Sequence, residues 1–515
     1  MPRAADGRSR CLCRILRGIV TPAGDRLAVL LGGRLAGTVR AGREGACWFS
    51  YNPEYAADRA AIPLSLSIPV EGGERDIADW MDGLLPARVE AREFWAAQYG
   101  AASDDPMGLL ATPIGWDCAG AVQFCTSDRL GEMAERAPNA VPLSEHEVES
   151  RLERLRQGLP PPAASGLIAP FSLAGAQVKT VLCKLPDGGW AAPDGGMPST
   201  HILKVALPGY PDTDLVEHVC MDTLRRAGVA AARTEIVAAG NQRAIAVERY
   251  DRSAGDGGAI GRVHQEDLCQ ALGFPSRFKF QRNGGPSAFD IANLLARVAT
   301  VRDAQRFYDA LVCNWLLAAD DAHAKNYSLL LSGGGEVALA PLYDVCSKAP
   351  WIPPEVGEGG ISLAMQVGSA RSVSEADMPR PWRECAAEVG LDPIGALDRA
   401  VYLSGRLPEA LAEAIGSLPA QYSGSPRIAA LAELSEPRPA HGWGRHSGWQ
   451  PPRAPEPPAD PLAEAVRIAG PPAAGAGPEL PAGRRSTRCP HVGRRTRRRC
   501  NRPFGHRGTH TYDKR

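Results

Sequence analysis

The order of strand-like and helix-like segments is the feature that most constrains the fold of this chain. From Phe171 onward, segments rich in β-branched and aliphatic residues come first, and apolar stripes at helical spacing follow. The strand-like segments span 178–185, 200–207, 233–237 and 244–249, with a helix-like segment at 212–227; the later helix-like segments span 264–272, 289–298 and 303–318. This order predicts an α+β body of two lobes, one rich in strands and one mostly helical.

A mixed α/β region precedes this body. Two short apolar runs in 25–39 surround Gly32 and Gly33, which predicts a β-hairpin. A strand-like segment at 46–51 and helix-like segments at 77–84 and 88–99 follow. The predicted organisation is as follows: residues 1–24 form an N-terminal extension, 25–125 an α/β subdomain, 126–165 a connector, 166–250 a strand-rich nucleotide-binding part, 251–431 a helical catalytic part, 432–483 a disordered Pro- and Ala-rich linker, and 484–515 a basic tail. The connector contains a polar helix at 144–157.

The composition is that of a soluble protein. Of the 515 residues, 44% are hydrophobic and 23% are charged, and the formal net charge is zero. A neutral chain has no overall electrostatic attraction to nucleic acid or to membranes. No apolar window approaches the length of a membrane span, and the 13 cysteines form no compact disulfide framework. We therefore expect a cytoplasmic protein that does not bind membranes.

Residues 320–344 carry the most specific chemical pattern in the chain. Asp321 and Asn326 are separated by four residues, and an apolar run leads from them to Asp344. Protein-kinase catalytic centres have this layout: the first Asp accepts the proton of the substrate hydroxyl, and the Asn and second Asp hold Mg²⁺. Mg²⁺ is a hard cation that prefers oxygen ligands. The pattern therefore predicts a centre for phosphoryl transfer.

Three upstream features fit such a centre, although each also has an ordinary structural explanation. Residues 172–179 form a small-residue turn that could cradle phosphate with Lys179, or could be a plain hairpin turn. Lys204 lies in an apolar strand, where a cation needs a partner such as Glu217, or where it could sit on a solvated edge. Residues 247–251 end a strand where adenine could bind, or are simply a strand terminus.

His323 is open to more than one interpretation. A single histidine between two alanines is usually a hydrogen-bonded structural residue. Together with Asp321 and Asp344 it could instead ligate the metal of a hydrolase. Mg²⁺ prefers oxygen, however, and no second histidine stands at metal-ligand spacing. We assign His323 an orienting role in the catalytic loop.

Taken in order, these features resemble the HipA family of serine/threonine kinases, the toxins of HipBA-type toxin–antitoxin modules. The resemblance covers roughly residues 25–420 and implies a bilobal, protein-kinase-like fold of the α+β class. The matching segments are LSLSIPV (64–70), DGLLPA (82–87), IGWDCAGAVQF (114–124), SLAGAQVK (172–179), HILK (201–204), VERYDR (247–252), QEDLCQALG (265–273), DDAHAKNYSLLL (320–331) and PLYD (341–344).

The resemblance assigns roles to individual residues. It implies Asp321 as general base with His323 and Asn326 in the same loop, and Asn326 and Asp344 as Mg²⁺ ligands. The implied ATP-binding residues are Ala174, Gly175, Ala176, Gln177, Val178 and Lys179 in a phosphate loop, Lys204 at the phosphates, Glu248, Arg249 and Tyr250 at the adenine, and His323, Lys325, Asn326, Tyr343 and Asp344. Ser172 is the implied site of inactivating autophosphorylation, because a phosphate there would repel the phosphates of ATP.

The chain departs from the family pattern in two places. Asp320 stands where the family often has Thr, which adds a carboxylate next to Asp321. The tail has no counterpart in the kinase pattern, and its residues 484–515 contain twelve Arg and Lys and one acidic residue, which suggests contact with nucleic acid. Four residues of this tail have the types and spacing of Zn²⁺ ligands: Cys489, Cys500, His506 and His510. His491 could replace one of them. The alternative is a basic tail in which the Cys and His residues are incidental.

The leading prediction is a Ser/Thr protein kinase that uses ATP and Mg²⁺, phosphorylates a cellular protein and acts as a toxin. In the family that the chain resembles, the characterised substrate is glutamyl-tRNA synthetase. The implied partner is a small helix-turn-helix antitoxin similar to HipB, through which the chain would contact DNA indirectly. Two alternatives stay open: a non-catalytic, kinase-like binding protein or co-repressor that acts with an antitoxin and nucleic acid, and a kinase for a small molecule or lipid.

Overall fold

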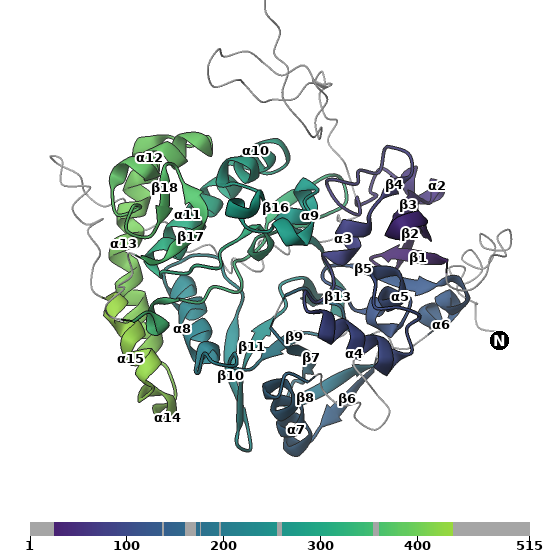
Figure 1. The fold of residues 1–515 in the computed structure, drawn as a ribbon, viewed down its shortest axis with the longest axis horizontal. Coiled ribbons are helices and arrows are strands. Elements are labelled where there is room, and N and C mark those ends of the chain that lie inside the picture. Colours follow the sequence, from purple (N-terminus) through teal and green to yellow (C-terminus); the bar gives the residue numbers. More distant parts are fainter. Residues whose placement is uncertain are drawn as a thin grey trace, which may run out of the picture. The chain divides into compact units, whose positions relative to one another are not determined.

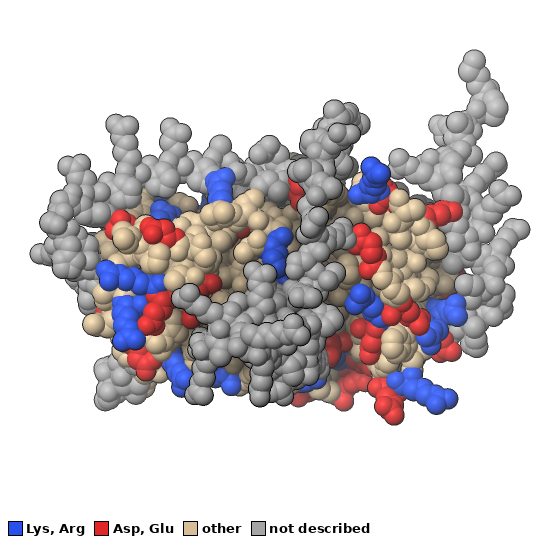
Figure 2. Space-filling model, turned by 90° about the horizontal axis from the view of Figure 1, so that it is seen from above, with Lys and Arg blue, Asp and Glu red and all other residues tan. Residues whose placement is uncertain are grey.

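The computed structural model describes residues 25–135, 139–159, 171–175, 177–194, 197–254, 260–353 and 360–435. Ala176, the linker from residue 436 onward and the basic tail with its four expected Zn²⁺ ligands lie outside these ranges. Within them, no helix is both long enough and apolar enough to cross a membrane. On the face that Figure 2 shows, basic and acidic side chains are interspersed, as expected for a chain with no net charge.

The N-terminal part contains a five-stranded antiparallel sheet. Its strands, in order across the sheet, are β4 (Arg75–Asp76), β3 (Cys47–Tyr51), β2 (Arg34–Ala41), β1 (Arg26–Leu31) and β5 (Val122–Thr126). The predicted hairpin is confirmed, since β1 pairs with β2 and Gly32 and Gly33 take the positive φ angles, 58° and 76°, that its tight turn requires. The described residues of this part form five α-helices: α2 (Pro53–Ala56), α3 (Ala78–Asp82), α4 (Val89–Tyr99), α5 (Pro106–Leu110) and α6 (Leu130–Glu135).

A six-stranded antiparallel sheet follows, with a helix on each face (Figure 1). Its order is β10 (Thr234–Ala239), β11 (Gln242–Glu248), β9 (His201–Lys204), β7 (Lys179–Lys184), β8 (Trp190–Asp194) and β6 (Asn139–Leu143). Along β11, Ala244 and Ala246 pack in one cluster with α7 (Glu145–Arg156), whereas Ile245 and Val247 pack in another with α8 (Thr213–Arg226). Successive side chains of a strand point to opposite faces, so both faces of the sheet are covered.

Two sequence-based expectations need correction here. Residues 139–156, part of the predicted connector, form β6 and α7 and therefore belong to the six-stranded sheet and its cover. The predicted helix at 264–272 is half strand: β14 (His264–Asp267) pairs with β15 (Ser328–Leu331), and only α9 (Leu268–Leu272) is helical. The reason is that the Asp267 side chain accepts hydrogen bonds from two backbone N–H groups of α9, which makes it the N-cap of a helix that starts at Leu268.

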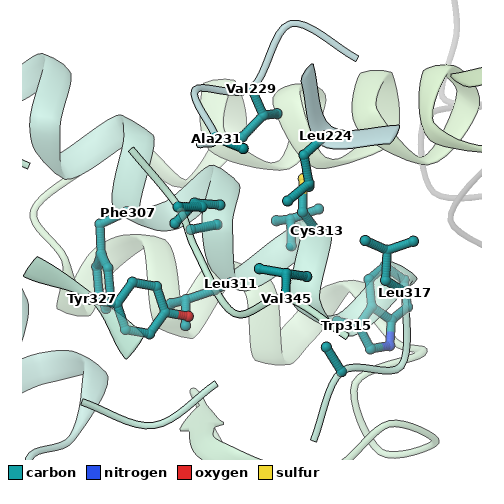
Figure 3. Packing of buried hydrophobic residues seen from close by; sticks show 14 of the residues in the cluster. Leu224, Val229, Ala231, Phe307, Leu311, Cys313, Trp315, Leu317, Tyr327 and Val345 are labelled. Carbon is teal, nitrogen blue, oxygen red and sulfur yellow. The ribbon is translucent and has the colours of Figure 1, made fainter. Parts of the chain in front are cut away.

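The C-terminal part is mostly helical, as predicted. Its helices are α10 (Ala288–Val298), α11 (Val301–Leu316), α12 (Pro379–Glu388), α13 (Pro393–Gly416), α14 (Ala420–Ser423) and α15 (Pro426–Ala432); its short strands are β12 (Arg252–Ala254), β13 (Ile260–Arg262), β16 (Val337–Leu339), β17 (Ser362–Val367) and β18 (Ala370–Ser372). Phe307, Leu311 and Trp315 of α11 are buried in its core (Figure 3). Burying one such side chain stabilises the fold by about 1.5–3 kcal/mol. This core supports β15 and the loop before it, which carry the candidate site.

Candidate active site

Lys204, near the end of β9, is the centre of the candidate site. It is 4% exposed, so its charge requires partners within the protein. Its Nζ donates to Glu217 Oε1 of α8 at 2.8 Å and also pairs with Asp344. Burial acts to lower the pKa of Lys204, but the two carboxylates raise it above its usual range. The fold thus joins the strand lysine, the helix glutamate and the aspartate of PLYD in one cluster.

Residues 321–326 form a tight loop that is held by its own backbone. Asp321 O accepts hydrogen bonds from His323 N and from Asn326 Nδ2, both at 2.8 Å. The Asp321 side chain is 61% exposed, whereas the His323 ring is buried. Its Nε2 lies 3.7 Å from Asp321 Oδ1, too far for a direct hydrogen bond. The loop therefore leaves the Asp321 carboxylate accessible and keeps the imidazole in the interior.

His323 is neutral in this environment. Burial, together with the nearby charge of Lys279, lowers the pKa of His323 to about 3. The ring packs edge-on against Phe280, with ring centroids 4.8 Å apart. A neutral, tightly packed imidazole contributes shape and hydrogen-bonding capacity rather than charge.

Tyr343 and Asp344 connect this loop to Lys204. The Tyr343 hydroxyl donates to Lys325 O at 2.8 Å and lies 2.6 Å from Ser328 Oγ. Asp344 has a positive φ of 56°, a strained backbone conformation for a residue other than glycine. Burial acts to raise the pKa of Asp344, but the ammonium groups of Lys204 and Lys179 lower it. Asp344 is therefore ionised, and its side chain is 39% exposed.

The phosphate-loop residues lead directly into β7. Gly175 has a φ of 119°, and a Cβ at this position would lie 2.5 Å from Lys179 Nζ, so only glycine fits. Lys179 Nζ donates to Ala174 O at 2.6 Å, and burial lowers the pKa of Lys179 to about 8. Gln177 Nε2 donates to Val205 O at 2.7 Å. The side chains of Lys179 and Gln177 thus hold the loop against the sheet.

Ser172, at the start of this loop, is fully buried. Its Oγ donates to Leu84 O at 2.9 Å, and its N–H donates to Asp117 O at 2.9 Å. Val178, near the other end of the loop, packs against the core of the six-stranded sheet. A phosphate can reach the Ser172 hydroxyl only if this segment leaves its position.

The DGLLPA segment of the N-terminal part contacts both functional loops. Gly83 O accepts a hydrogen bond from Lys325 Nζ at 3.1 Å, and Ala87 N donates to Gly175 O at 3.2 Å. Lys325 also pairs with Asp267 at 2.5 Å. The Lys325 side chain, expected at the nucleotide, therefore has two protein partners. The sequence indicated this segment only through its resemblance, with no sign of its contacts.

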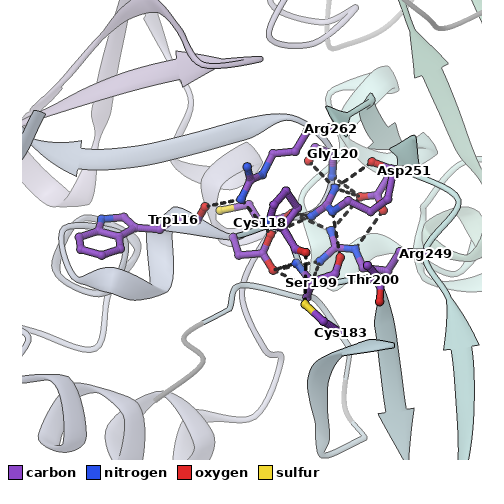
Figure 4. A network of polar contacts seen from close by, with 12 residues as sticks. Trp116, Cys118, Gly120, Cys183, Ser199, Thr200, Arg249, Asp251 and Arg262 are labelled. Atoms are coloured by element: carbon purple, nitrogen blue, oxygen red, sulfur yellow. Dashed lines mark hydrogen bonds and ion pairs between the residues drawn. The ribbon is translucent and has the colours of Figure 1, made fainter. Parts of the chain in front are cut away.

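The expected adenine-binding residues 248–250 are tightly tied to their surroundings. Glu248 N donates to Arg233 O at 2.8 Å, and Tyr250 is buried with its hydroxyl bonded to Gln265. The Arg249 guanidinium belongs to a buried polar network that includes Asp251 (Figure 4). The Arg249 side chain is consequently not available to contact a nucleotide. Only the backbone of this residue could contact adenine.

Two family models match this chain: the HipA N-terminal domain over residues 27–125, and the HipA-like C-terminal domain over residues 171–415. Y4mE of Sinorhizobium fredii, which is named as a candidate kinase, is 32% identical over 412 residues, or 78% of this chain and 94% of Y4mE. The chain belongs to the HipA family. The serine/threonine-protein kinase toxin HipA of Shewanella oneidensis is 28% identical over 311 residues, or 56% of this chain and 67% of that protein.

The HipA-like fold is also found by comparison with solved structures. HipA of Shewanella oneidensis MR-1, solved with HipB and its operator DNA, matches with a TM-score of 0.66 and 25% identity, over 80% of this chain and 96% of that one. The predicted kinase-like fold of the α+β class is therefore confirmed. As a HipA-family member, the chain has relatives that are named as kinases.

The residues of this HipA-family site suit Mg²⁺. Asn326 uses its Nδ2 in the hydrogen bond to Asp321 O, which leaves its amide oxygen available as a ligand, and the Asp344 carboxylate is part-exposed. Among the residues that the structure covers, no group of three or more His, Cys, Asp and Glu side chains could hold a metal. Mg²⁺ needs no such group, because it is usually held by one or two protein ligands together with phosphates and water.

Sequence reasoning missed one segment of this site. Lys279 and Phe280 both contact the catalytic loop, through Lys279 O, which accepts from Ala324 N at 3.2 Å, and through the Phe280 ring against His323. The available signal was a lysine between two phenylalanines ahead of a Gly-Gly pair. Nothing in that pattern shows which distant loop the lysine meets.

Proposed function

We propose that this HipA-family chain is a serine/threonine protein kinase that uses ATP and Mg²⁺ and acts as a toxin on a cellular protein. The observation that carries the proposal is the buried pairing of Lys204 with Glu217 and Asp344. Burying an ammonium between two carboxylates is costly in desolvation, and perturbed groups of this kind are concentrated at functional sites. The pairing places a cation next to the Mg²⁺ ligand expected from the family.

Each residue then has a defined task. Bound ATP and Mg²⁺ supply the phosphoryl group and neutralise its charge. Lys204 and Lys179 hold phosphate oxygens, and Glu217 keeps Lys204 in place. Asp344 and the Asn326 amide oxygen hold the metal. Asp321, whose carboxylate is accessible, accepts the proton of the acceptor hydroxyl.

Ser172 is the proposed site of self-inactivation. Its hydroxyl is fully buried against Leu84 O, which leaves no room for a phosphate dianion in that position. Phosphorylated Ser172 would keep the loop displaced, and Gly175 and Lys179 would no longer meet the phosphates of ATP. Phosphopeptide mapping after prolonged incubation with ATP tests this; an active enzyme with unmodified Ser172 would contradict it.

We also propose a HipB-like antitoxin as the partner. A solved relative is a complex of HipA with HipB and its operator DNA, and that HipA chain matches 80% of the present one. DNA contact would then pass through the antitoxin. Co-purification with the product of a neighbouring gene that encodes a small helix-turn-helix protein tests this.

The activity test is incubation of the full chain with labelled ATP and Mg²⁺, followed by mass spectrometry of the chain and of a cell lysate. Asp321→Ala and Asp344→Ala are each expected to abolish transfer, because one removes the base and the other a metal ligand. Asp320→Ala is the matched control, since it removes the adjacent carboxylate, and it should retain activity. Near wild-type transfer by Asp321→Ala at equal loading would refute the assignment. Consumption of ATP without any labelled protein would favour a small-molecule acceptor.

A further inference from the structure

Lys279 lies beside the catalytic loop, outside every predicted motif. Its carbonyl accepts a hydrogen bond from Ala324 N at 3.2 Å, and the following residue, Phe280, packs edge-on against the His323 ring. Further along the segment, Gln281 Oε1 accepts from Gln366 N at 2.7 Å. The backbone of Lys279 is therefore held at its own carbonyl and through the two residues that follow it, close to the loop that carries the expected base.

Among the residues that the structure describes, the Lys279 ammonium has no partner of opposite charge. Among the described residues, no carboxylate oxygen lies within 4.0 Å of it, and it donates no hydrogen bond; its contact is with the face of the Phe280 ring, 5.1 Å from the centroid. Two neighbouring cations are paired, Arg277 with Asp79 at 3.2 Å and Lys325 with Asp267, whereas Arg282 lies over the other contact of this segment, the Phe280 ring, 4.1 Å from its centroid. Lys279 is therefore free to bind an anion.

The charge of Lys279 also reaches the catalytic residues. Partial desolvation by the surrounding loop raises the pKa of Asp321, and Lys279 is the strongest influence in the opposite direction, ahead of Arg282. Lys279 likewise contributes to the lowered pKa of His323, after burial. Together with the hydrogen bond from Ala324 N to the Lys279 carbonyl, these effects place the ammonium within electrostatic range of the base.

We propose that Lys279 is a further catalytic residue, whose ammonium group contacts the oxygens of the phosphoryl group as it passes to the acceptor hydroxyl beside Asp321. This inference rests on the proposed kinase function. Charge on those oxygens is what a phosphotransferase must stabilise, and a fixed cation does so without reorganisation during the reaction.

The transfer is balanced without any proton change at Lys279. The acceptor oxygen forms a bond to the γ-phosphorus of ATP while the bond from that phosphorus to the bridging oxygen breaks. The bonding electron pair leaves with ADP, and the proton of the acceptor hydroxyl goes to Asp321. Lys279 stays protonated throughout and acts only through its charge and its hydrogen-bond donors.

A binding experiment separates this role from a structural one. Full-length wild type and Lys279→Met are titrated calorimetrically with ADP and Mg²⁺, and then with ADP, Mg²⁺ and aluminium fluoride, which mimics the phosphoryl group in transfer. We expect Lys279→Met to bind ADP within about twofold of wild type and to lose about tenfold or more of its affinity for the aluminium fluoride complex. We also expect kcat to fall about a hundredfold, with part of it recovered in Lys279→Arg.

Arg277→Met is the matched control, because it removes the same charge from the same segment but from a side chain paired with Asp79. It should change neither affinity. Equal affinity of wild type and Lys279→Met for the aluminium fluoride complex would overturn the inference. A similar loss of ADP affinity would also overturn it, since Lys279 would then be a structural residue. A wild type that binds neither ligand would refute the proposed function and this inference together.

Discussion

Asp117→Asn should strongly destabilise the protein, because Asp117 is part of a buried charged network that ties the N-terminal part to the segment after β11. Asp117 is 5% exposed. Its carboxylate accepts from Ser199 Oγ at 2.6 Å and from Arg252 Nη2 at 2.8 Å, and lies 3.4 Å from Arg249 Nη1 and 3.5 Å from Arg262 Nη2. Figure 4 shows Ser199, Arg249 and Arg262 of this network, which converge from segments far apart in the chain.

The magnitude follows from the charges in this network. Three arginines face two aspartates, Asp117 and Asp251, so the network carries one excess positive charge, and the substitution makes this two. Burial acts to raise the pKa of Asp117, but the three arginines lower it, so the carboxylate is ionised. Removing one partner from a buried ion pair costs about 3–5 kcal/mol. Asn can still accept a hydrogen bond from Ser199, so we expect a loss of about 3 kcal/mol.

Urea unfolding followed by tryptophan fluorescence measures this loss. The free energy of unfolding is compared between wild type, Asp117→Asn and a control, Asp79→Asn. Asp79 also pairs with an arginine, Arg277, but the two side chains are 54% and 66% exposed. The control should therefore lose less than about 0.5 kcal/mol. A loss below about 1 kcal/mol in Asp117→Asn, or equal losses in both variants, would refute the argument that burial makes this network important.

Three further predictions concern other buried charges. Burial raises the pKa of Glu266 to about 8, so its contribution to stability is fully present below its unfolded pKa and is lost as the pH rises toward 8. Between pH 5 and 8.5, the free energy of unfolding of Glu266→Gln should therefore fall by about 1–3 kcal/mol less than that of wild type. Chemical denaturation at several pH values measures this, and parallel profiles would contradict it. Lys204→Met should weaken ATP binding about tenfold or more in calorimetry, because the phosphates lose a buried cation; unchanged affinity would exclude Lys204 from the nucleotide site. Lys325→Met should cost about 3 kcal/mol in the same denaturation assay, since it leaves Asp267 buried without its partner, and wild-type stability would show that the pair is dispensable.

Local structure was largely readable from the sequence, because it depends on neighbours in the chain. The hairpin at Gly32 and Gly33 follows from a conformation that glycine adopts freely. Four strands of the six-stranded sheet, β7, β9, β10 and β11, and the helices α10 and α11 follow from residue type and apolar periodicity, and capping boxes at Ser287 and Thr300 mark where these two helices begin. The prediction of a helix over 264–272 failed for the converse reason. The strand β14 forms because it pairs with β15, which lies far away in the sequence.

The candidate site shows more clearly which features the sequence predicts and which depend on the fold. The order of Asp321, Asn326 and Asp344 along the chain was enough to predict phosphoryl-transfer chemistry, since ligand type and spacing lie in the sequence. The partners of the buried charges were not readable in this way. Lys204 meets Asp344 across 140 residues. Arg249, expected at the adenine, has its guanidinium buried in the network with Asp117.

Lys279 illustrates the physical reason. Its sequence neighbours suggest nothing about catalysis, yet the fold brings it next to the catalytic loop, where no carboxylate of the described residues neutralises it. Whether a charged side chain is solvated, paired or free to bind an anion depends on which distant groups surround it. The sequence by itself determined which chemical groups were present and in what order. The tertiary structure alone decided which charges meet, because the interaction energy of two charges depends on their distance and on their burial, and both are set only when the chain has folded.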